Sequence, residues 1–343
     1  MSLGLVGCGR LASAGYLPAL QHCPAIRLTD VVDIDSARAD AFAAEAGAVA
    51  GRDVSIHGSV DELLAHGRAD GVLLATPAAF HLDDARTLAA AGIPTLVEKP
   101  PAPDAATAAE LAALSPAPWV AFNRRFDRGA RTVKTAIGVD EPVDLHLSIS
   151  YRRTTWGAHV VDDEALIDLG PHLVDWARWL IDGEVLAVSR ADLGPERVEL
   201  DLRLSRGSAT LRAATDRPHA EVIEARRPDG QMIVRHQIGG LVAGIVGRLR
   251  PAPGPSSLVA GLVGELHAFA SVLRGEPARD LGTAADGLAA MAVVDAARES
   301  SASGAPVAIT PTSLPPDVPP DASVPPPSAT SPRDSPNSSK ESH

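Results

Sequence analysis

Four polar or aromatic side chains recur at helical spacing in the second half of the chain. Asp168, His172, Asp175 and Trp179 follow one another at intervals of four, three and four residues, which places them on one face of a helix. An imidazole, with a pKa of about 6.5, is suited to take the proton that an alcohol loses as a hydride leaves its carbon. A carboxylate one turn away would bind a hydroxyl or hold the imidazole. The structural alternative is a core histidine, with Asp168 as a helix cap.

A lysine in the first half is placed where it could act on the same substrate. In Glu98-Lys99-Pro100-Pro101, Pro100 restricts Lys99 to extended geometry and ends the strand, so the ammonium projects from the sheet edge. There it would act as an acid or base, or orient a substrate oxygen and offset the charge of a developing alkoxide. The alternative is a solvated lysine at a strand end.

A glycine loop opens the chain. Gly7-Cys8-Gly9-Arg10-Leu11-Ala12 matches G-x-G-x-x-A between an apolar strand and a helix that begins near Leu11, the arrangement in which backbone amides and a helix N-terminus bind a pyrophosphate. Asp33 ends the second strand and would accept hydrogen bonds from both hydroxyls of an adenosine ribose. Because a carboxylate there repels a 2′-phosphate, NAD is favoured over NADP. Arg38 softens that preference, and a glycine turn in another α/β domain is the structural alternative.

The elements that must position these groups alternate in the first half. We expect strands at residues 3–6, 26–33, 71–76, 95–98 and 119–122, separated by helices at 11–21, 36–46, 60–65, 80–91 and 105–114. This order is typical of a doubly wound parallel sheet. We therefore predict a Rossmann domain over residues 1–122.

After residue 140 the pattern changes to consecutive strands with polar turns. Strands are expected at 143–151, 198–204, 209–213, 221–225 and 232–236, with helices at 164–181, 258–273 and 284–300. We predict an α+β domain with a mainly antiparallel, open sheet over residues 123–310, whose last helices pack back on the first domain. The Pro/Ser-rich residues 311–343 are predicted to be a disordered tail. The segment 238–257 receives no structural or functional assignment.

Composition excludes several classes of protein. The chain has 343 residues, of which 45% are hydrophobic and 3% aromatic, and its formal net charge of −12 would repel nucleic acid and anionic membranes. Two cysteines rule out a disulfide framework or a thiolate metal cluster, and no other spacing predicts a metal site. No apolar run is long enough to span a bilayer, and Met1 leads directly into a strand without a signal-type segment. We expect a soluble cytoplasmic protein.

Five landmarks in order resemble the Gfo/Idh/MocA family of oxidoreductases, which includes glucose-fructose oxidoreductase and inositol dehydrogenase. They are GCGRLA at 7–12, VVDIDSARA at 31–39, ATPAAFH at 75–81, VEKP at 97–100 and IDLGPHLVDWARWL at 167–180. The resemblance covers residues 3 to about 309. It implies that Lys99, Asp168 and His172 are the catalytic set, with Lys99 beside both the nicotinamide and the substrate hydroxyl.

The resemblance also assigns a cofactor surface. Besides the glycine loop and Asp33, the residues concerned follow two further strands: Thr76, Pro77, His81, Glu98 and Lys99. The family usually carries Asn after the Pro, whereas this chain has Ala78, so one polar contact is missing. His81 either faces the cofactor or is a helix-start residue bonded to backbone.

The substrate pocket is predicted less specifically. Besides Asp168 and His172, its candidates are Asn123, Arg125 and Trp156, although an arginine after a strand is more often an ion-pair partner at the surface. A Gly-Gly pair usual before the catalytic helix is replaced by residues of the sequence VDDE at 161–164. This departure bears on loop shape and substrate position.

The function expected is NAD-dependent hydride transfer between nicotinamide and a secondary alcohol or ketone of a sugar, cyclitol or related polyol. Two alternatives use the same fold: a catalytically inactive protein that senses a dinucleotide or sugar, and NAD-assisted glycoside cleavage without net redox change. Family relatives often pair through the second sheet, so we expect a homodimer or homotetramer. Nucleic acid and membranes are not expected as partners.

Overall fold

The first half of the chain folds around a parallel sheet. The computed structural model describes residues 1–51, 53–138, 141–156, 164–239, 256–278 and 280–310. The first sheet has the order β13-β6-β5-β4-β1-β2-β3 and is parallel except for β13. Its strands are β1 (Ser2–Val6), β2 (Arg27–Val32), β3 (Ser55–His57), β4 (Gly71–Leu74), β5 (Thr95–Glu98), β6 (Trp119–Ala121) and β13 (Gly282–Thr283). The predicted doubly wound sheet is confirmed.

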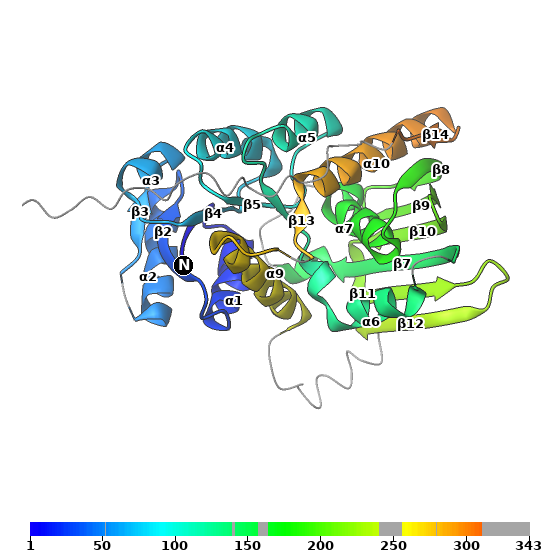
Figure 1. Cartoon of the computed structure of the whole chain (residues 1–343), viewed down its shortest axis with the longest axis horizontal. Helices are drawn as coiled ribbons and strands as arrows, with labels where there is room; N and C mark the ends of the chain where they lie inside the picture. The colour runs from blue at the N-terminus through cyan, green and yellow to red at the C-terminus, as the bar shows by residue number, and fades with distance from the viewer. Residues whose placement is uncertain (52, 139–140, 157–163, 240–255, 279, 311–343) are drawn as a thin grey trace, which may run out of the picture. The chain divides into compact units, whose positions relative to one another are not determined.

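Helices cover both faces of this sheet (Figure 1). One layer is α3 (Val60–His66), α4 (Ala78–Ala90) and α5 (Ala105–Ala112), whose apolar side chains pack on Val6, Val72 and Val97. The other is the π-helical turn η1 (Ala12–Tyr16), α1 (Leu17–Gln21), α2 (Ser36–Ala50) and α9 (Ser257–Leu273), packed on Leu3, Leu5 and Leu73. Strand residues are apolar on both sides because neither face meets water.

The second sheet carries the other half of the site. Its order is β12-β11-β7-β10-β9-β8-β14, and all pairs are antiparallel except β7 with β10. The strands are β7 (Val143–Arg152), β8 (Val185–Leu193), β9 (Arg197–Leu204), β10 (Gly207–Ala214), β11 (Asp216–Arg226), β12 (Met232–Gly239) and β14 (Val307–Ala308). The second half also contains two 3₁₀ turns, η2 (Asn123–Phe126) and η3 (Arg153–Trp156). Its helices are α6 (Arg128–Ile137), α7 (Ala165–Ile181) and α10 (Ala284–Ser303). The predicted mainly antiparallel sheet is also confirmed.

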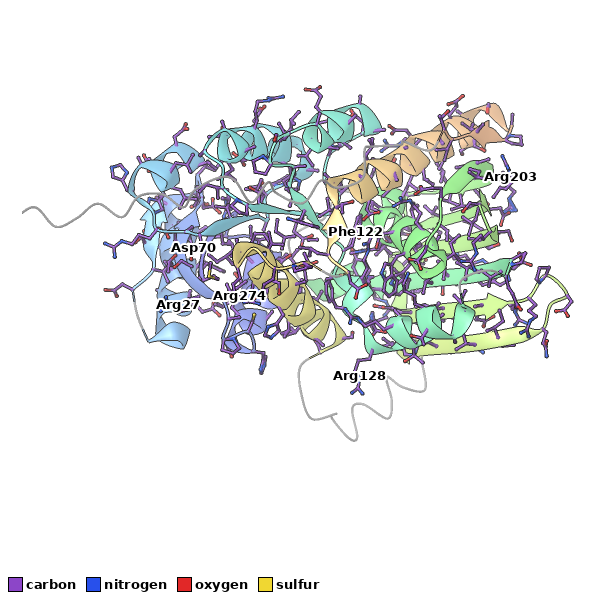
Figure 2. The ribbon with its side chains drawn as sticks, viewed as in Figure 1. Arg27, Asp70, Phe122, Arg128, Arg203 and Arg274 are labelled. Carbon is purple, nitrogen blue, oxygen red and sulfur yellow. The ribbon has the colours of Figure 1, made fainter. Side chains whose placement is uncertain are left out.

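The C-terminal part of the described chain returns to the first sheet. On α9, Leu262, Leu266 and Phe269 are fully buried in the core beneath β1, and β13 pairs with β6 at the sheet edge. Phe122, directly after β6, is buried where the two halves meet, whereas the charged residues labelled in Figure 2 are exposed. The domain limit near residue 122 stays a prediction. Residues 240–255 and the predicted tail, 311–343, lie outside the described residues.

Sequence patterns missed five elements. Strands β3, β8, β13 and β14 and helix α6 were not predicted. β3, β13 and β14 have three residues or fewer, too short for a periodic signal, and only Ala130, Val133 and Ile137 of α6 are buried. Among the described residues, no helix has both the length and the apolar character needed to cross a membrane.

The glycine loop shows why one of its glycines is indispensable to the fold. Gly7 has φ +94° and its N–H donates to the carbonyl of Val32 at 2.8 Å. A Cβ there would lie 2.8 Å from the carbonyl oxygen of Ala75, whereas one on Gly9 would meet nothing within 4 Å. Gly7 therefore serves the backbone crossing, and Gly9 leaves open space above the helix start.

Replacing Gly7 with alanine should lower the free energy of unfolding by about 2 kcal/mol or more, because the side chain would be strained and would overlap Ala75. Gly9→Ala, two residues away, is the matched control and should cost less than about 1 kcal/mol. Urea unfolding of both variants measures the difference. Equal midpoints would contradict this account of the loop.

Candidate active site

Residues that follow four parallel strands meet at one edge of the first sheet. The glycine loop follows β1, Thr76 follows β4 after one residue, Lys99 follows β5, and Asn123 follows β6 after one residue. Ligands of open α/β sheets bind at this carboxyl edge. Here the edge faces α7, β7 and β11 across a cavity of about 360 Å³.

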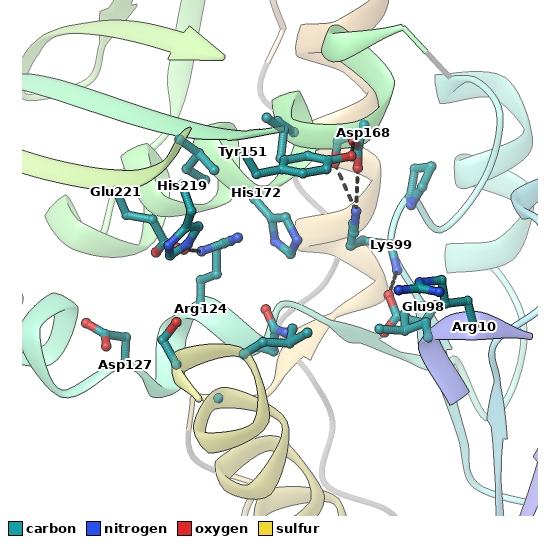
Figure 3. A pocket seen from close by; sticks show the side chains of 18 residues that line it. Arg10, Glu98, Lys99, Arg124, Asp127, Tyr151, Asp168, His172, His219 and Glu221 are labelled. Carbon is teal, nitrogen blue, oxygen red and sulfur yellow. Dashed lines mark hydrogen bonds and ion pairs between the residues drawn. The ribbon is translucent and has the colours of Figure 1, made fainter. Parts of the chain in front are cut away.

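The cavity brings together most of the predicted catalytic and substrate residues (Figure 3). Of the predicted residues, those that line it are Arg10, Leu11, Glu98, Lys99, Asn123, Asp168 and His172. Side chains that were not predicted complete the wall, notably Arg124, Asp127, Tyr151, His219 and Glu221. The cavity therefore joins groups from both halves of the chain.

Lys99 is held against the second half by Asp168. Its Nζ donates to the backbone carbonyl of Asp168 at 2.9 Å and lies 3.3 Å from the carboxylate oxygen Oδ1. Both side chains are mostly buried, at 17% and 12% exposure, which strengthens the ion pair relative to one at the surface. The ammonium thus projects from the end of β5 into the cavity, as the sequence predicts.

The other oxygen of Asp168 accepts a hydrogen bond from Tyr151, at the end of β7. Burial, followed by the charge of Asp168, raises the pKa of Tyr151, so the phenol remains a donor. Sequence reasoning missed Tyr151. The available signal was its rarity, because the chain has only two tyrosines.

His172 is buried at the cavity wall, and its imidazole is neutral. Burial first, then the positive charges of Lys99 and Arg124, hold its pKa well below the usual 6.5. Its Nδ1 has no hydrogen-bond partner within the described part of the chain, and its ring meets Phe122 edge-on with centroids 6.4 Å apart. Of the two roles predicted for the carboxylate one turn away, holding the imidazole is not seen among the described residues, because Asp168 contacts Lys99, Tyr151 and, at 4.0 Å, Arg153. The imidazole is therefore free to accept a proton.

The prediction that Arg125 lines the substrate pocket needs correction. Its guanidinium is buried and bonded to Asp175, with Nε 2.9 Å and Nη2 2.5 Å from the carboxylate, and it also pairs with Asp286 at 2.9 Å. Asp175 and Trp179 share the helix with His172, but neither lines the cavity. A buried guanidinium needs a carboxylate beside it to compensate its charge, and Asp175 provides one for Arg125.

Arg124, the preceding residue, enters the cavity in its place. It forms an ion pair with Glu221 of β11, and His219 lies 3.1 Å from the same carboxylate. Burial opposes ionisation of Glu221, but Arg124 and His219 prevail and lower its pKa to about 2. This charged wall stands across the cavity from Lys99 (Figure 3).

The predicted dinucleotide site keeps the features a pyrophosphate and ribose need. Space is open at Gly9, where the helix begins, and Asp33 accepts hydrogen bonds from the N–H groups of Cys8 and Asp35. Burial opposes ionisation of Asp33, yet the hydrogen bond from Arg38 and those backbone donors lower its pKa. Arg38 lies 2.6 Å from Asp33, so a cation does stand beside the ribose position.

The remaining predicted residues differ in their hydrogen-bond partners and positions. Thr76 Oγ1 is buried with no partner among described atoms, so it can bond a ligand. His81 is buried and its ring nitrogens contact the carbonyls of Thr76 and Pro101, which agrees with the backbone-bonded alternative. Pro77 is the N-cap of α4. The side chain of Trp156 lies outside the described residues, as do residues 157–163.

The described residues contain no group of three or more His, Cys, Asp or Glu side chains that could hold a metal ion. A phosphate cradle, an ionised carboxylate at the ribose position and an unpartnered hydroxyl together fit a dinucleotide. The fold and the cavity define a dinucleotide-binding α/β protein with ionisable groups from both halves of the chain at the carboxyl edge of its first sheet.

Comparisons with known proteins agree. Residues 1–117 match the Gfo/Idh/MocA model, described as an oxidoreductase family with an NAD-binding Rossmann fold. The rhizopine catabolism protein MocA of Rhizobium meliloti is 28% identical over 322 residues, covering 87% of this chain and 94% of that protein. The myo-inositol dehydrogenase Hyg17 of Streptomyces leeuwenhoekii is 31% identical over 201 residues, 55% of this chain and 58% of that one. Residues 1–117 are thus similar to the NAD-binding Rossmann domain of the Gfo/Idh/MocA oxidoreductases.

Solved structures show the same fold across both halves. The myo-inositol dehydrogenase of Lactobacillus casei, crystallised with NAD(H) and myo-inositol, superposes with a TM-score of 0.74 at 18% identity, covering 92% of this chain and 98% of that one. A putative myo-inositol dehydrogenase of Sinorhizobium meliloti gives 0.73 at 23% identity, covering 90% and 100%. The alignment with Hyg17 spans just over half of that dehydrogenase's length.

The structural role of Arg125 can be tested by stability. Arg125→Met should lower the free energy of unfolding by about 3–5 kcal/mol, because Asp175 would keep a buried charge without its main partner. Adding Asp175→Leu should recover much of the loss. The exposed neighbour Arg128 is the control, and Arg128→Met should change stability by less than about 0.5 kcal/mol. Similar urea midpoints for Arg125→Met and Arg128→Met would refute this role.

Proposed function

We propose that this protein transfers a hydride between NAD and a secondary alcohol of a cyclitol, sugar or related polyol, or the corresponding ketone. The observation that carries the proposal is the contact of Lys99 with Asp168, which puts an ammonium from the first half and the helix of His172 in one cavity. Relatives named as inositol dehydrogenases support the substrate class.

The role of each side chain follows from its charge and its hydrogen bonds. NAD, when bound, supplies the carbon that accepts or gives the hydride. Lys99 donates a hydrogen bond to the substrate oxygen and offsets its negative charge as the O–H proton leaves. His172, neutral and with an unpartnered nitrogen, accepts that proton. Asp168 positions Lys99 and accepts a hydrogen bond from a substrate hydroxyl.

The Gly9 loop, Asp33 and Thr76 are proposed to hold the dinucleotide, and Asn123 the substrate. Support comes from the open space at Gly9, the unpartnered hydroxyl of Thr76 and the place of Asn123 in the cavity wall. A sensor protein would not need a neutral imidazole and an ammonium in one cavity. The dehydrogenase is therefore favoured over the sensor.

We also propose a cytoplasmic homo-oligomer. The cytoplasmic location is supported by Cys8 and Cys23, which are free and buried, as suits a reducing compartment. The oligomer is supported by the outer face of the second sheet, which is polar and hollowed. That hollow, of about 420 Å³, is lined among others by His146, Arg212 and Glu224. Self-complementary charges of this kind suit pairing of two copies.

The catalytic assignment predicts two inactive variants that still bind NAD. Lys99→Met and His172→Gln should each lower kcat by about 10²-fold to 10⁴-fold, the range for losing an oxyanion-stabilising or general-base group. NADH absorbance with a panel of inositols and aldoses measures turnover, and calorimetry measures NAD binding. Tight NAD binding by the wild type without turnover on the whole panel would favour the sensor, and cleaved glycosides without NADH would indicate glycoside cleavage.

The charge around His172 predicts a pH profile. Because its pKa lies well below its ordinary value, kcat/KM for alcohol oxidation should not fall on its account until the pH drops well below the range in which a free imidazole binds a proton. Arg124→Met removes one of the two cations that lower this pKa, so the acidic limb should move to higher pH. A limb that stays in place would contradict the general-base role of His172.

A further inference from the structure

A second buried cluster lies under the floor of the cavity and is not used in the mechanism above. The phenol oxygen of Tyr16 lies 2.6 Å from Oε1 of Glu98 and 3.0 Å from Oε1 of Glu265. Tyr16 and Glu265 have no exposed surface, and Glu98 is 6% exposed where it lines the cavity. Three elements distant in the chain thus bring two carboxyl groups to one hydroxyl.

The hydrogen bonds of this cluster require an additional proton. A phenol has one proton to donate, and an ionised carboxylate can only accept. If Tyr16 donates along the shorter contact to Glu98, the contact to Glu265 is a hydrogen bond only when Glu265 donates to the phenol oxygen. Two ionised carboxylates around one buried hydroxyl would also repel each other without compensation.

The surroundings of the two carboxyl groups show which one holds that proton. Oε2 of Glu98 accepts the backbone N–H of Lys99 at 2.9 Å. Burial raises the pKa of Glu98, but the charge of Lys99 and the hydrogen bonds from Tyr16 and the Lys99 backbone oppose that shift and favour an anion there. Oε2 of Glu265 is buried without a partner among the described residues, an environment that a charged oxygen would find costly. Burial, followed by the charge of Glu98, raises the pKa of Glu265 well above its ordinary value, and the hydrogen bond with Tyr16 only partly opposes this. The asymmetry places the anion on Glu98 and the acid on Glu265.

We propose that Glu265 is a protonated carboxylic acid that, through Tyr16, holds Glu98 as a carboxylate at the cavity floor beside Lys99. Glu98 is then a positioning residue with two effects. Its backbone hydrogen bond fixes Lys99 at the end of β5, and its charge favours the oxidised, positively charged nicotinamide over the reduced one. The second effect rests on the proposed function, whereas the protonation of Glu265 does not.

Infrared spectroscopy of the full chain without cofactor tests the protonation directly. The wild type at neutral pH should show the carbonyl band of a protonated carboxylic acid, and Glu265→Gln should remove it. Glu110→Gln, at an exposed glutamate paired with Arg86, is the matched control and should retain the band. A band that survives Glu265→Gln, or that disappears instead in Glu98→Gln, would overturn the assignment.

Stability against pH gives an independent readout. An acid neutral in the folded protein but ionised in the unfolded chain binds more protons when folded, so its contribution is complete below about pH 4.3 and is lost as pH rises. From about pH 5 to about pH 8, the folded-to-unfolded ratio of the wild type should therefore fall relative to Glu265→Gln, by up to about tenfold per pH unit. A difference independent of pH would count against a neutral Glu265.

The effect on the cofactor is tested by binding, not by turnover. Glu98→Gln should raise the ratio of the Kd for NAD⁺ to the Kd for NADH, on the order of tenfold. Glu265→Leu should shift the ratio in the same direction, and Glu265→Gln, whose amide can still donate to Tyr16, should restore it. A ratio unchanged in Glu98→Gln would overturn the positioning role. Absence of polyol turnover would sink the proposed function alone, because the infrared and stability results need neither substrate nor cofactor.

Discussion

The ammonium of Lys99 and the carboxylate of Asp168 lie 3.3 Å apart although 69 residues separate them. This ion pair is the point at which the parallel sheet and the second sheet are joined within the cavity. Each partner is placed by its own half: Lys99 by the end of β5, and Asp168 by the first turn of α7. A change in the packing of α7 on its sheet would therefore separate the two groups and disassemble the site.

Placing several charges near one cavity is possible because each is paired. Arg125 lies between Asp175 and Asp286, Arg124 faces Glu221, and Lys99 faces Asp168. Removing one partner leaves the other without compensation, which is why such networks are costly to break. His172 is the exception, since burial, with the cations of Lys99 and Arg124, leaves its imidazole as an uncharged base in the cavity.

Much of this arrangement could be predicted from sequence, and the reasons are local. The glycine loop, the strand end at Lys99 and the four-residue interval from Asp168 to His172 each depend on a few adjacent residues, and the structure places them as those patterns indicate. Arg125 could not be distinguished from Arg124 in this way, because which arginine enters the cavity depends on the distant Asp175 and Glu221. Tyr151 and Glu265 were missed for the same reason.

The two tyrosines of the chain orient the carboxyl groups on either side of Lys99 and keep their own protons. Tyr16 donates to Glu98 on one side of Lys99, and Tyr151 donates to Asp168 on the other. Each phenol has its pKa raised, with burial as the first cause, so neither tyrosine gives up its proton to the carboxylate beside it. The carboxylates are thereby oriented by neutral donors, and Lys99 is left as the cation between them that can turn to a substrate oxygen. Rigid orientation of both neighbours is what lets a flexible four-carbon side chain act at a defined position.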